Sequence, residues 1–424
     1  MSKEKILAIY PGHNATVGLF EEGADPVVIQ EEKLTNIKNY IGAPEKSISY
    51  FSKKLGKGFK DIVSFPNSME NMLFLFLPDK KYFIEEASQG GLRKVWNYLE
   101  YKVGWRSPVV KDLMLKIRNY LLEKAVSPKC KKVFEALLNK KFSIEASKIK
   151  YIDHHTCHAL SPVAFYNLKE KKDKFLLFSM DGAGDMAFAK IFIYDSTNGK
   201  DEFSLLSSSG FEASLGLLYS EVTKFLGMKP NEHEYKVMGL AAFVNDPKYY
   251  SKAYDKLKDL VWLDKETLTF KSRINLNIAY NYLKDNLIGV RFDNISAAVQ
   301  KLVENYVNEW IQTAIEKTGI RKIACSGGVF LNVKMNKIIL ENPAVEEVYF
   351  MPSSGDESAV FGASYLQAIE KGINFHSPKS MYLGMEYSGK EAEKFLKEKG
   401  YFDKYKVEYV EDIEKITAQL LASK

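Results

Sequence analysis

Three of the six histidines in this 424-residue chain fall within five positions, at His154, His155 and His158. The apolar residues 149–152 come just before them and predict a strand that leads into a helix. In a helix, His154 and His158 would lie on one face, where two imidazoles can bind one metal ion. His155 would point about 100° away from them. The spacing predicts a metal site or a catalytic site built on His154 and His158.

Two imidazoles leave a metal incompletely coordinated, and carboxylates at strand ends are the usual remaining ligands for iron or zinc. Asp181 and Asp356 each follow an apolar run that predicts a strand, and each lies among glycines or serines. Asp185 is in the same turn as Asp181 and is a competing candidate. Cys157 lies among the histidines, but a regular register turns it away from its neighbours, and free cysteines favour burial.

Two glycine-containing turns could receive an anion. The first contains Gly182 and Gly184, and the second contains Ser326, Gly327 and Gly328. Glycines let backbone N–H groups approach a phosphate, and the helix expected after Gly328 would present its N-terminus to it. Neither turn has the spacing of a P-loop or of a dinucleotide-binding motif. The turns predict phosphate binding, with an ordinary tight turn as the alternative.

A further histidine lies at the tip of the first predicted hairpin, where His13 and Asn14 follow a Pro-Gly pair. Loop tips often carry function, although a single loop histidine is usually only solvated. The hairpin is the counterpart of the one that carries Asp181, so both tips could face one cleft. We expect His13 to do acid/base work or to orient a substrate.

The elements that must position these residues suggest an internal duplication. Residues 6–20 predict a strand, a polar turn and a second strand, and a third strand follows at 27–30. Residues 176–194 repeat the pattern of an apolar run, a glycine turn and a returning apolar run. We therefore expect two lobes, 1–175 and 176–376.

The second lobe also shows α/β alternation. Residues 295–319 have helical spacing, a strand follows at 322–325, and a glycine turn leads into a helix at 329–340. Such a lobe has parallel strands, and its ligands bind at their carboxyl ends. Residues 67–147 predict a helical insertion or cap. Residues 377–424 predict the start of a further domain, with a strand at 405–410.

Composition restricts the class of protein. Hydrophobic residues make up 46% of the chain and aromatic residues 13%, enough for a large core. A net charge of +6 without long like-charge blocks gives no indication of a nucleic-acid partner. No segment approaches the roughly 20 apolar residues of a membrane span, and no signal peptide is apparent. With only three scattered cysteines, we expect a cytoplasmic protein in a reducing compartment.

At this point the sequence resembles the carbamoyltransferase family that includes the nodulation-factor and aminoglycoside-antibiotic carbamoyltransferases. The resemblance covers nearly the whole chain except the helical insertion. It is carried by these motifs in order: ILAIYPGHNATVGLF (6–20), EEKLTNIK (31–38), DHHTCHA (153–159), MDGAGD (180–185), SLGLLYSEVTKFLGMKPNEHEYKVMGLA (214–241), SGGVFLN (326–332) and PSSGDES (352–358).

The resemblance implies a duplicated actin/Hsp70/sugar-kinase (ASKHA) fold, close to that of the tRNA threonylcarbamoyl-transfer proteins. It implies an iron-like divalent metal, with zinc possible, bound by four residues: His154, His158, Asp181 and Asp356. In that family a carboxyl-terminal domain makes carbamoyl-adenylate from carbamoyl phosphate and ATP. The first domain then passes the carbamoyl group to a hydroxyl of an acceptor, here a small molecule or a saccharide.

The same resemblance places Lys236, Gly239 and Asn332 around the nucleotide and suggests that Lys38 binds an anionic group. For both lysines a solvated surface position is the alternative. The chain departs from the family pattern at four positions. Lys33, Asn36 and Asn39 stand where the family usually has Arg, Arg and His, and Ser358 stands at a common glycine. Arginine and lysine are not equivalent at a bidentate site, so anion binding there would be altered.

The expected activity is therefore that of a carbamoyltransferase component that needs its activating domain, supplied in trans or by a longer chain. Two alternatives remain open from the residues. One is a sugar-kinase-like phosphotransferase, in which the histidine pair has no obvious use. The other is a non-catalytic nucleotide-binding partner.

Overall fold

The computed structural model describes residues 4–55, 62–67, 100–102, 107–121, 124 and 127–423. The chain forms two compact units, Met1–Leu383 and Gly384–Lys424. None of the described helices combines the length and the apolar character that crossing a membrane requires.

The first five-stranded sheet is mixed. Its order is β4 (Val27–Gln30), β3 (Thr16–Glu21), β1 (Lys5–Tyr10), β6 (Ile62–Asn67) and β7 (Ile149–Asp153). The three strands from the predicted meander pair antiparallel, whereas β1, β6 and β7 are parallel. Parallel neighbours need crossover connections, which place helices on the faces of the sheet.

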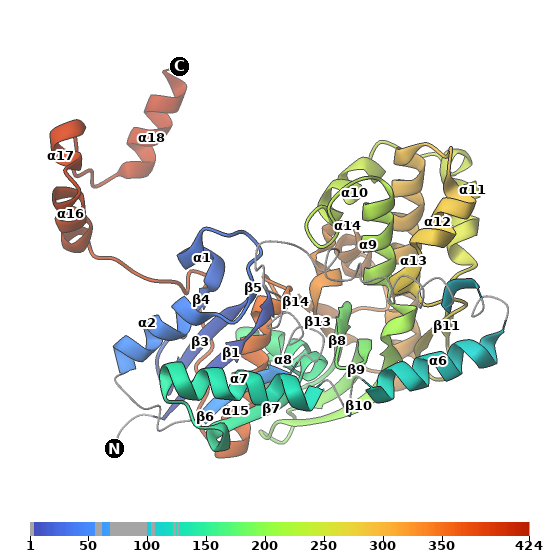
Figure 1. The fold of residues 1–424 in the computed structure, drawn as a ribbon, viewed down its shortest axis with the longest axis horizontal. Helices are drawn as coiled ribbons and strands as arrows, with labels where there is room; N and C mark the ends of the chain where they lie inside the picture. The colour runs from blue at the N-terminus through green and yellow to red at the C-terminus, as the bar shows by residue number, and fades with distance from the viewer. Residues whose placement is uncertain are drawn as a thin grey trace. The chain divides into compact units, whose positions relative to one another are not determined.

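The second sheet has the same strand order and the same strand directions. It runs β10 (Glu202–Gly210), β9 (Ala187–Asp195), β8 (Lys174–Gly184), β13 (Lys322–Ser326) and β14 (Glu347–Phe350). Its first three strands are antiparallel, and β13 is parallel to both β8 and β14. The predicted α/β class is confirmed, and Figure 1 shows strands and helices alternating through the larger unit.

Two helices fill the space between the sheets. Helix α15 (Ala359–Lys371) packs on the first sheet, and α8 (His154–Tyr166) packs on the second and against α15. The two helices approach closely, because a Cβ added at Gly362 would lie 1.8 Å from the carbonyl oxygen of Cys157. Cys157 is fully buried in the apolar core between the sheets. It is not part of the metal cluster found among the described residues.

A second apolar core lies on the other side of the second sheet. Its centre is Trp310 on α13 (Phe292–Thr318), fully buried and 5.0 Å from the ring of Phe178. The predicted helix at 295–319 is thus confirmed. The elements around this core are α9 (Leu215–Phe225), α10 (Glu234–Ala241), α11 (Pro247–Lys258), α12 (Tyr280–Leu287), α14 (Val333–Leu340), β11 (Val261–Asp264) and β12 (Thr269–Ser272).

Two described helices lie in the segment where a helical insertion is predicted. Helices α6 (Pro108–Leu121) and α7 (Ser127–Phe142) lie within it, and much of the remainder of 67–147 falls outside the described residues. The small elements of the first part of the chain are β2 (Gly12–His13), β5 (Ile41–Gly42), α1 (Glu31–Thr35) and α2 (Glu45–Leu55).

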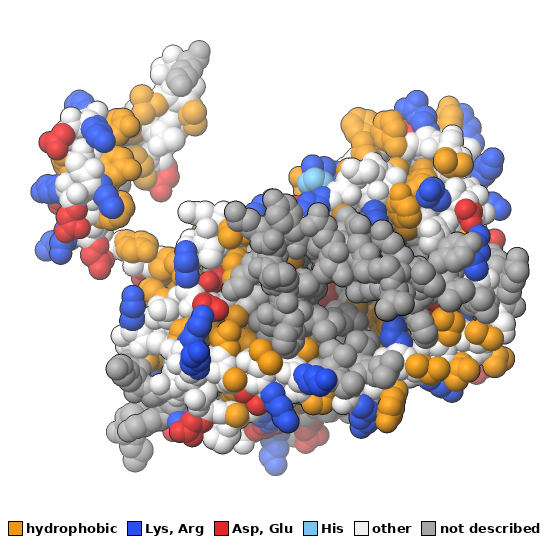
Figure 2. Space-filling view, viewed as in Figure 1, with side chains coloured by type: hydrophobic (Ala, Val, Ile, Leu, Met, Phe, Trp, Pro, Cys, Tyr) orange, Lys and Arg blue, Asp and Glu red, His pale blue; other side chains and the backbone are white. Residues whose placement is uncertain are grey.

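The smaller unit contains α16 (Gly389–Glu398), α17 (Tyr401–Lys404) and α18 (Ile413–Ala422). The strand expected at 405–410 is wrong: no described strand pairs with this segment, and an unpaired strand leaves its backbone groups without partners. No described residue of this unit is buried. Figure 2 shows apolar side chains on its surface, and these include Phe395, Ile413, Leu420 and Leu421.

Candidate metal centre

The start of α8 places two histidines on one buried face. Asp153, the last residue of β7, caps the helix by accepting a hydrogen bond of 2.8 Å from the backbone N–H of Thr156. His154 and His158 are therefore one helical turn apart, as their spacing predicted. Both side chains are fully buried, and their ring centroids are 4.6 Å apart.

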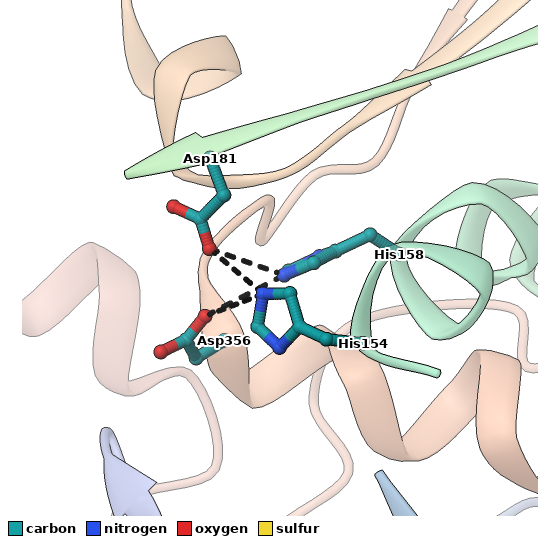
Figure 3. Close-up of side chains that lie close together, drawn as sticks. All are labelled: His154, His158, Asp181 and Asp356. Atoms are coloured by element: carbon teal, nitrogen blue, oxygen red, sulfur yellow. Dashed lines mark hydrogen bonds and ion pairs between the residues drawn. The ribbon is translucent and has the colours of Figure 1, made fainter. Parts of the chain in front are cut away.

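Two carboxylates from the second sheet face these imidazoles. Asp181 lies near the end of β8, and Asp356 begins the short 3₁₀ turn after β14. Figure 3 shows both aspartates pointing toward the Nε2 atoms of His154 and His158. We call these four residues the four-ligand cluster. The structure thus brings together the four residues predicted as metal ligands.

The separations within the four-ligand cluster fit a divalent metal. Oδ2 of Asp181 is 3.1 Å from Nε2 of His154 and 3.4 Å from Nε2 of His158. Oδ1 of Asp356 is 3.7 Å and 3.5 Å from the same two atoms. Ligands about 2.1 Å from a tetrahedral ion are about 3.4 Å apart. Among the described residues, Nε2 of His158 and Oδ1 of Asp356 are buried without a well-formed hydrogen bond. This is expected of atoms whose lone pairs serve as metal ligands.

Charges within the cluster shift the pKa values of its members. Burial alone would lower the pKa of His158, but the carboxylates of Asp181 and Asp356 outweigh burial and raise it to about 9. Burial would raise the pKa of Asp181, yet His154 and His158 hold it well below its usual range. The cluster without an ion is therefore an ion-paired group, in which a metal would displace a proton.

Glycines make room for the ligands and hold one of them. A Cβ at Gly184 would lie 2.2 Å from Cδ2 of His154. The backbone N–H groups of Gly182 and Gly328 donate to Oδ1 of Asp181 at 2.7 Å and 3.2 Å. These N–H groups, predicted to bind a phosphate, orient a carboxylate in this structure.

The turn after β13 has a similar supporting role. Gly327 has a φ of +107°, and a Cβ there would lie 2.2 Å from the carbonyl oxygen of Met180, so only glycine fits. Its N–H donates to the carbonyl oxygen of Ser354 at 3.0 Å. Ser326 is fully buried, with its Oγ 3.5 Å from Nδ1 of His158.

The tip of the first hairpin lies beside the four-ligand cluster. Nδ1 of His13 is 4.0 Å from Oδ2 of Asp356, and Nε2 of His13 is buried without a hydrogen-bond partner among the residues that the structure describes. Asn14 donates from Nδ2 to Oε2 of Glu357 at 3.3 Å. These contacts place the hairpin tip beside Asp356, which belongs to the same cluster as Asp181.

Tyr10 and Glu357 were missed by the sequence interpretation. Tyr10 ends β1, is fully buried, and lies 6.2 Å from the ring of His154. Burial first, and then the carboxylate of Asp356, raise its pKa well above the usual value, so the phenol stays neutral. In the sequence Tyr10 looks like one more apolar strand residue, and its position directly before the Pro-Gly turn was the available signal.

The competing candidates lie beside the four-ligand cluster. Asp185 accepts a hydrogen bond of 2.8 Å from the backbone N–H of His154, and so orients the start of α8. His155 points elsewhere, with Nδ1 2.7 Å from Oγ of Ser179 and Nε2 3.0 Å from the carbonyl oxygen of Ala187. Burial, together with the neighbouring His154, lowers the pKa of His155 to about 3, so its ring is neutral.

The remaining predicted residues lie outside the four-ligand cluster. Lys38, Lys236 and Gly239 are exposed. The side chain of Asn332 forms a reciprocal amide pair with Gln300, at 2.9 Å and 3.0 Å. None of these four makes a contact with the cluster among the interactions of the described residues.

Comparison with known proteins gives a family match over most of the chain. The sequence model described as carbamoyltransferase N-terminus matches residues 5–365. Protein MJ1058 of Methanocaldococcus jannaschii, whose function is uncharacterised, is 28% identical over 93% of this chain and 68% of its own length. Nodulation protein NolNO of Sinorhizobium fredii is 24% identical over 85% of this chain and 47% of its own length.

Among solved structures, HypF of T. kodakarensis is 13% identical, with a TM-score of 0.43. That similarity covers 88% of this chain and 48% of the HypF chain. The chain thus spans about half to two thirds of the length of the proteins it matches.

Proposed function

This chain belongs to the carbamoyltransferase family, and from that premise we propose that it transfers a carbamoyl group from carbamoyl-adenylate to an acceptor hydroxyl. A divalent metal, iron first and zinc second, is bound by the four-ligand cluster. The observation that carries the proposal is that two histidines and two aspartates from distant segments converge within 4.8 Å of one another. The repeated strand order supports a duplicated ASKHA fold.

His13 is suited to take the proton of the acceptor hydroxyl. Asp356 faces its Nδ1, which favours the tautomer with the proton on Nδ1 and leaves Nε2 as an acceptor. Nε2 is buried and has no other partner. As the hydroxyl oxygen attacks the carbamoyl carbon, its proton passes to His13, the bond to the phosphate oxygen breaks, and AMP leaves. A bound metal would supply positive charge for the phosphate that departs.

The adenylate is assigned to the side of the cluster formed by the two glycine turns. Gly182 and Gly328 are half-buried there, and a bound metal that draws Asp181 away would leave their N–H groups for a phosphate, with Asn332 one turn further on. Lys236 and Gly239 on α10 are exposed and available for the nucleotide, and Lys38 is available for an anionic group. Carbamoyl-adenylate itself would be made from carbamoyl phosphate and ATP by an activating domain in a longer or a separate chain.

Metal analysis tests the first half of the proposal. We expect one iron or zinc ion per chain after reconstitution, and its loss in His154→Ala. His376→Ala is the matched control, because the side chain of His376 is 39% exposed and pairs with Asp25, which is not a member of the four-ligand cluster. A wild-type chain without stoichiometric metal would overturn the metal site.

Product analysis tests the second half. With carbamoyl-adenylate and a panel of hydroxylated acceptors, we expect AMP and a carbamoylated acceptor. His13→Ala should slow this reaction by about 10²-fold or more, whereas His376→Ala should not. Formation of ADP and a phosphorylated sugar from ATP would favour a phosphotransferase, and nucleotide binding without turnover would favour a non-catalytic partner.

A further inference from the structure

The two histidines of the four-ligand cluster differ in the neighbours of Nδ1, the ring nitrogen that does not face the carboxylates. Nδ1 of His154 is buried and has no hydrogen-bond partner within the described part of the chain. Nδ1 of His158 instead faces two hydroxyls, with Oγ of Ser326 and Oγ of Ser358 each 3.5 Å away. Both serines are buried, and their hydroxyl oxygens are 3.5 Å from each other.

The direction of hydrogen bonding follows from the neighbours of Ser358. Its hydroxyl donates to the carbonyl oxygen of Gly355 at 2.9 Å, so only its lone pairs remain for His158. The carbonyl oxygen of Ser358 accepts a hydrogen bond of 2.7 Å from Ser161 on α8, which ties the turn to the helix that carries His158. A proton on Nδ1 of His158 would complete the contact with the lone pair of Ser358 and would leave the lone pair of Nε2 for an ion.

We propose that Ser326 and Ser358 are positioning residues that fix the ring orientation and the tautomer of His158 for metal binding. The inference rests on the proposed metal site. It gives Ser326 a different role from the nucleotide contact that the sequence suggested. Ser326 ends β13 and Ser358 lies on the turn of Asp356, so two segments of the second lobe meet at one imidazole from the helix after the first sheet.

Cobalt(II) is the probe for a direct test, because its visible absorption reports on ligand number and its affinity can be measured against a chelator. We expect Ser326→Ala/Ser358→Ala to bind cobalt about 10- to 100-fold more weakly than wild type, the usual effect of losing a partner of a ligand histidine. Ser364→Ala is the matched control. Ser364 is a fully buried serine of α15 whose hydroxyl has no hydrogen-bond partner among the described residues.

A second measurement separates positioning from a loss of packing. In zinc-loaded protein with ¹⁵N-labelled histidine, the Nδ1 proton of His158 should be visible in wild type and should exchange faster with water in the double variant. The thermal midpoint of the metal-free double variant measures separately what the lost hydrogen bond to Gly355 and the lost packing cost the fold.

The outcomes distinguish the two proposals. Equal cobalt affinity and equal proton exchange in wild type and double variant would overturn the role of the serines and leave the metal site standing. An equal loss of affinity in Ser364→Ala would also overturn it. A wild-type chain that binds neither cobalt nor zinc would overturn both proposals.

Discussion

Glycines, which have no Cβ, leave the space that a ligand of the metal centre occupies. The imidazole of His154 occupies the space where Gly184 would carry a Cβ. Gly182 lies two residues earlier near the end of β8. Among the described residues, a Cβ added at Gly182 would meet only Leu217, at 3.8 Å. Two glycines of one turn therefore differ in what they permit.

We expect Gly184→Ala to abolish stoichiometric metal binding, because the methyl group would displace the His154 ring from the cluster. Gly182→Ala keeps the N–H that donates to Asp181 and should retain bound metal. Elemental analysis of both reconstituted variants is the measurement. Full metal content in Gly184→Ala would show that His154 is not a ligand.

Among the residues of the site, spacing alone predicted the histidine pair, whereas the choice of Asp181 and Asp356 as its partners depended on the family resemblance. His154 and His158 follow from helical spacing alone. Asp181 and Asp185 share one turn, and only the fold shows that Asp185 binds the backbone of His154 while Asp181 faces the rings. Asn332 and Ser326 likewise depend on neighbours far along the chain, which no local pattern reveals.

Among the elements, α8 carries the site, and its position depends on its first residues. Asp153 caps the helix with Oδ1 and contacts Nζ of Lys190 at 2.7 Å with Oδ2. Burial would raise the pKa of Asp153, but the charge of Lys190 outweighs burial and lowers the pKa below the usual 3.8. The carboxylate therefore stabilises the fold above about pH 4, and this contribution is lost as the pH falls through the lowered folded-state pKa.

We expect Asp153→Ala to lower the stability of metal-free protein by about 1–2 kcal/mol at pH 7. Asp153→Asn retains an acceptor for the helix cap. It should lose only the part of the stabilisation that comes from the ion pair with Lys190. Urea denaturation at pH 7 and pH 3 measures both. The difference between wild type and Asp153→Asn should shrink at pH 3, and a difference that grows would contradict this account.

The contact between α8 and α15 is a second requirement. A methyl group at Gly362 cannot fit 1.8 Å from the Cys157 carbonyl, so Gly362→Ala must move the helices apart. We expect the free energy of unfolding to fall by about 3 kcal/mol or more, because overpacking in a dense core costs about 1–3 kcal/mol in milder cases. Thermal unfolding measures it. Gly389→Ala, with open space around the added Cβ, should have little effect.

For the whole molecule, the four-ligand cluster and both apolar cores belong to the larger unit. The smaller unit has no buried residue in its described part. We expect a chain ending at Leu383 to bind metal with unchanged stoichiometry and to unfold within about 2 °C of the full chain. Elemental analysis and calorimetry check this. Loss of metal on truncation would show that the smaller unit supports the site.

The fold could be predicted from sequence where local patterns repeat. The two hairpins with glycine turns, at 6–20 and 176–194, correctly predicted the first two strands of each sheet along the chain. The strand at 405–410 failed because alternation alone cannot supply a partner strand. The packing of α8 against α15 was also beyond prediction, since it depends on a single glycine that meets a backbone carbonyl from a distant segment.

The spread of the ligands along the chain has a consequence for biosynthesis. As the polypeptide emerges from the ribosome, the imidazoles and Asp181 come early, whereas Asp356 follows only after β13 and β14. An unfinished chain would thus offer an ion three donors, and the fourth arrives when the last strand of the second sheet is in place. We therefore expect the tightest retention of a metal only after the segment that carries Asp356 has folded.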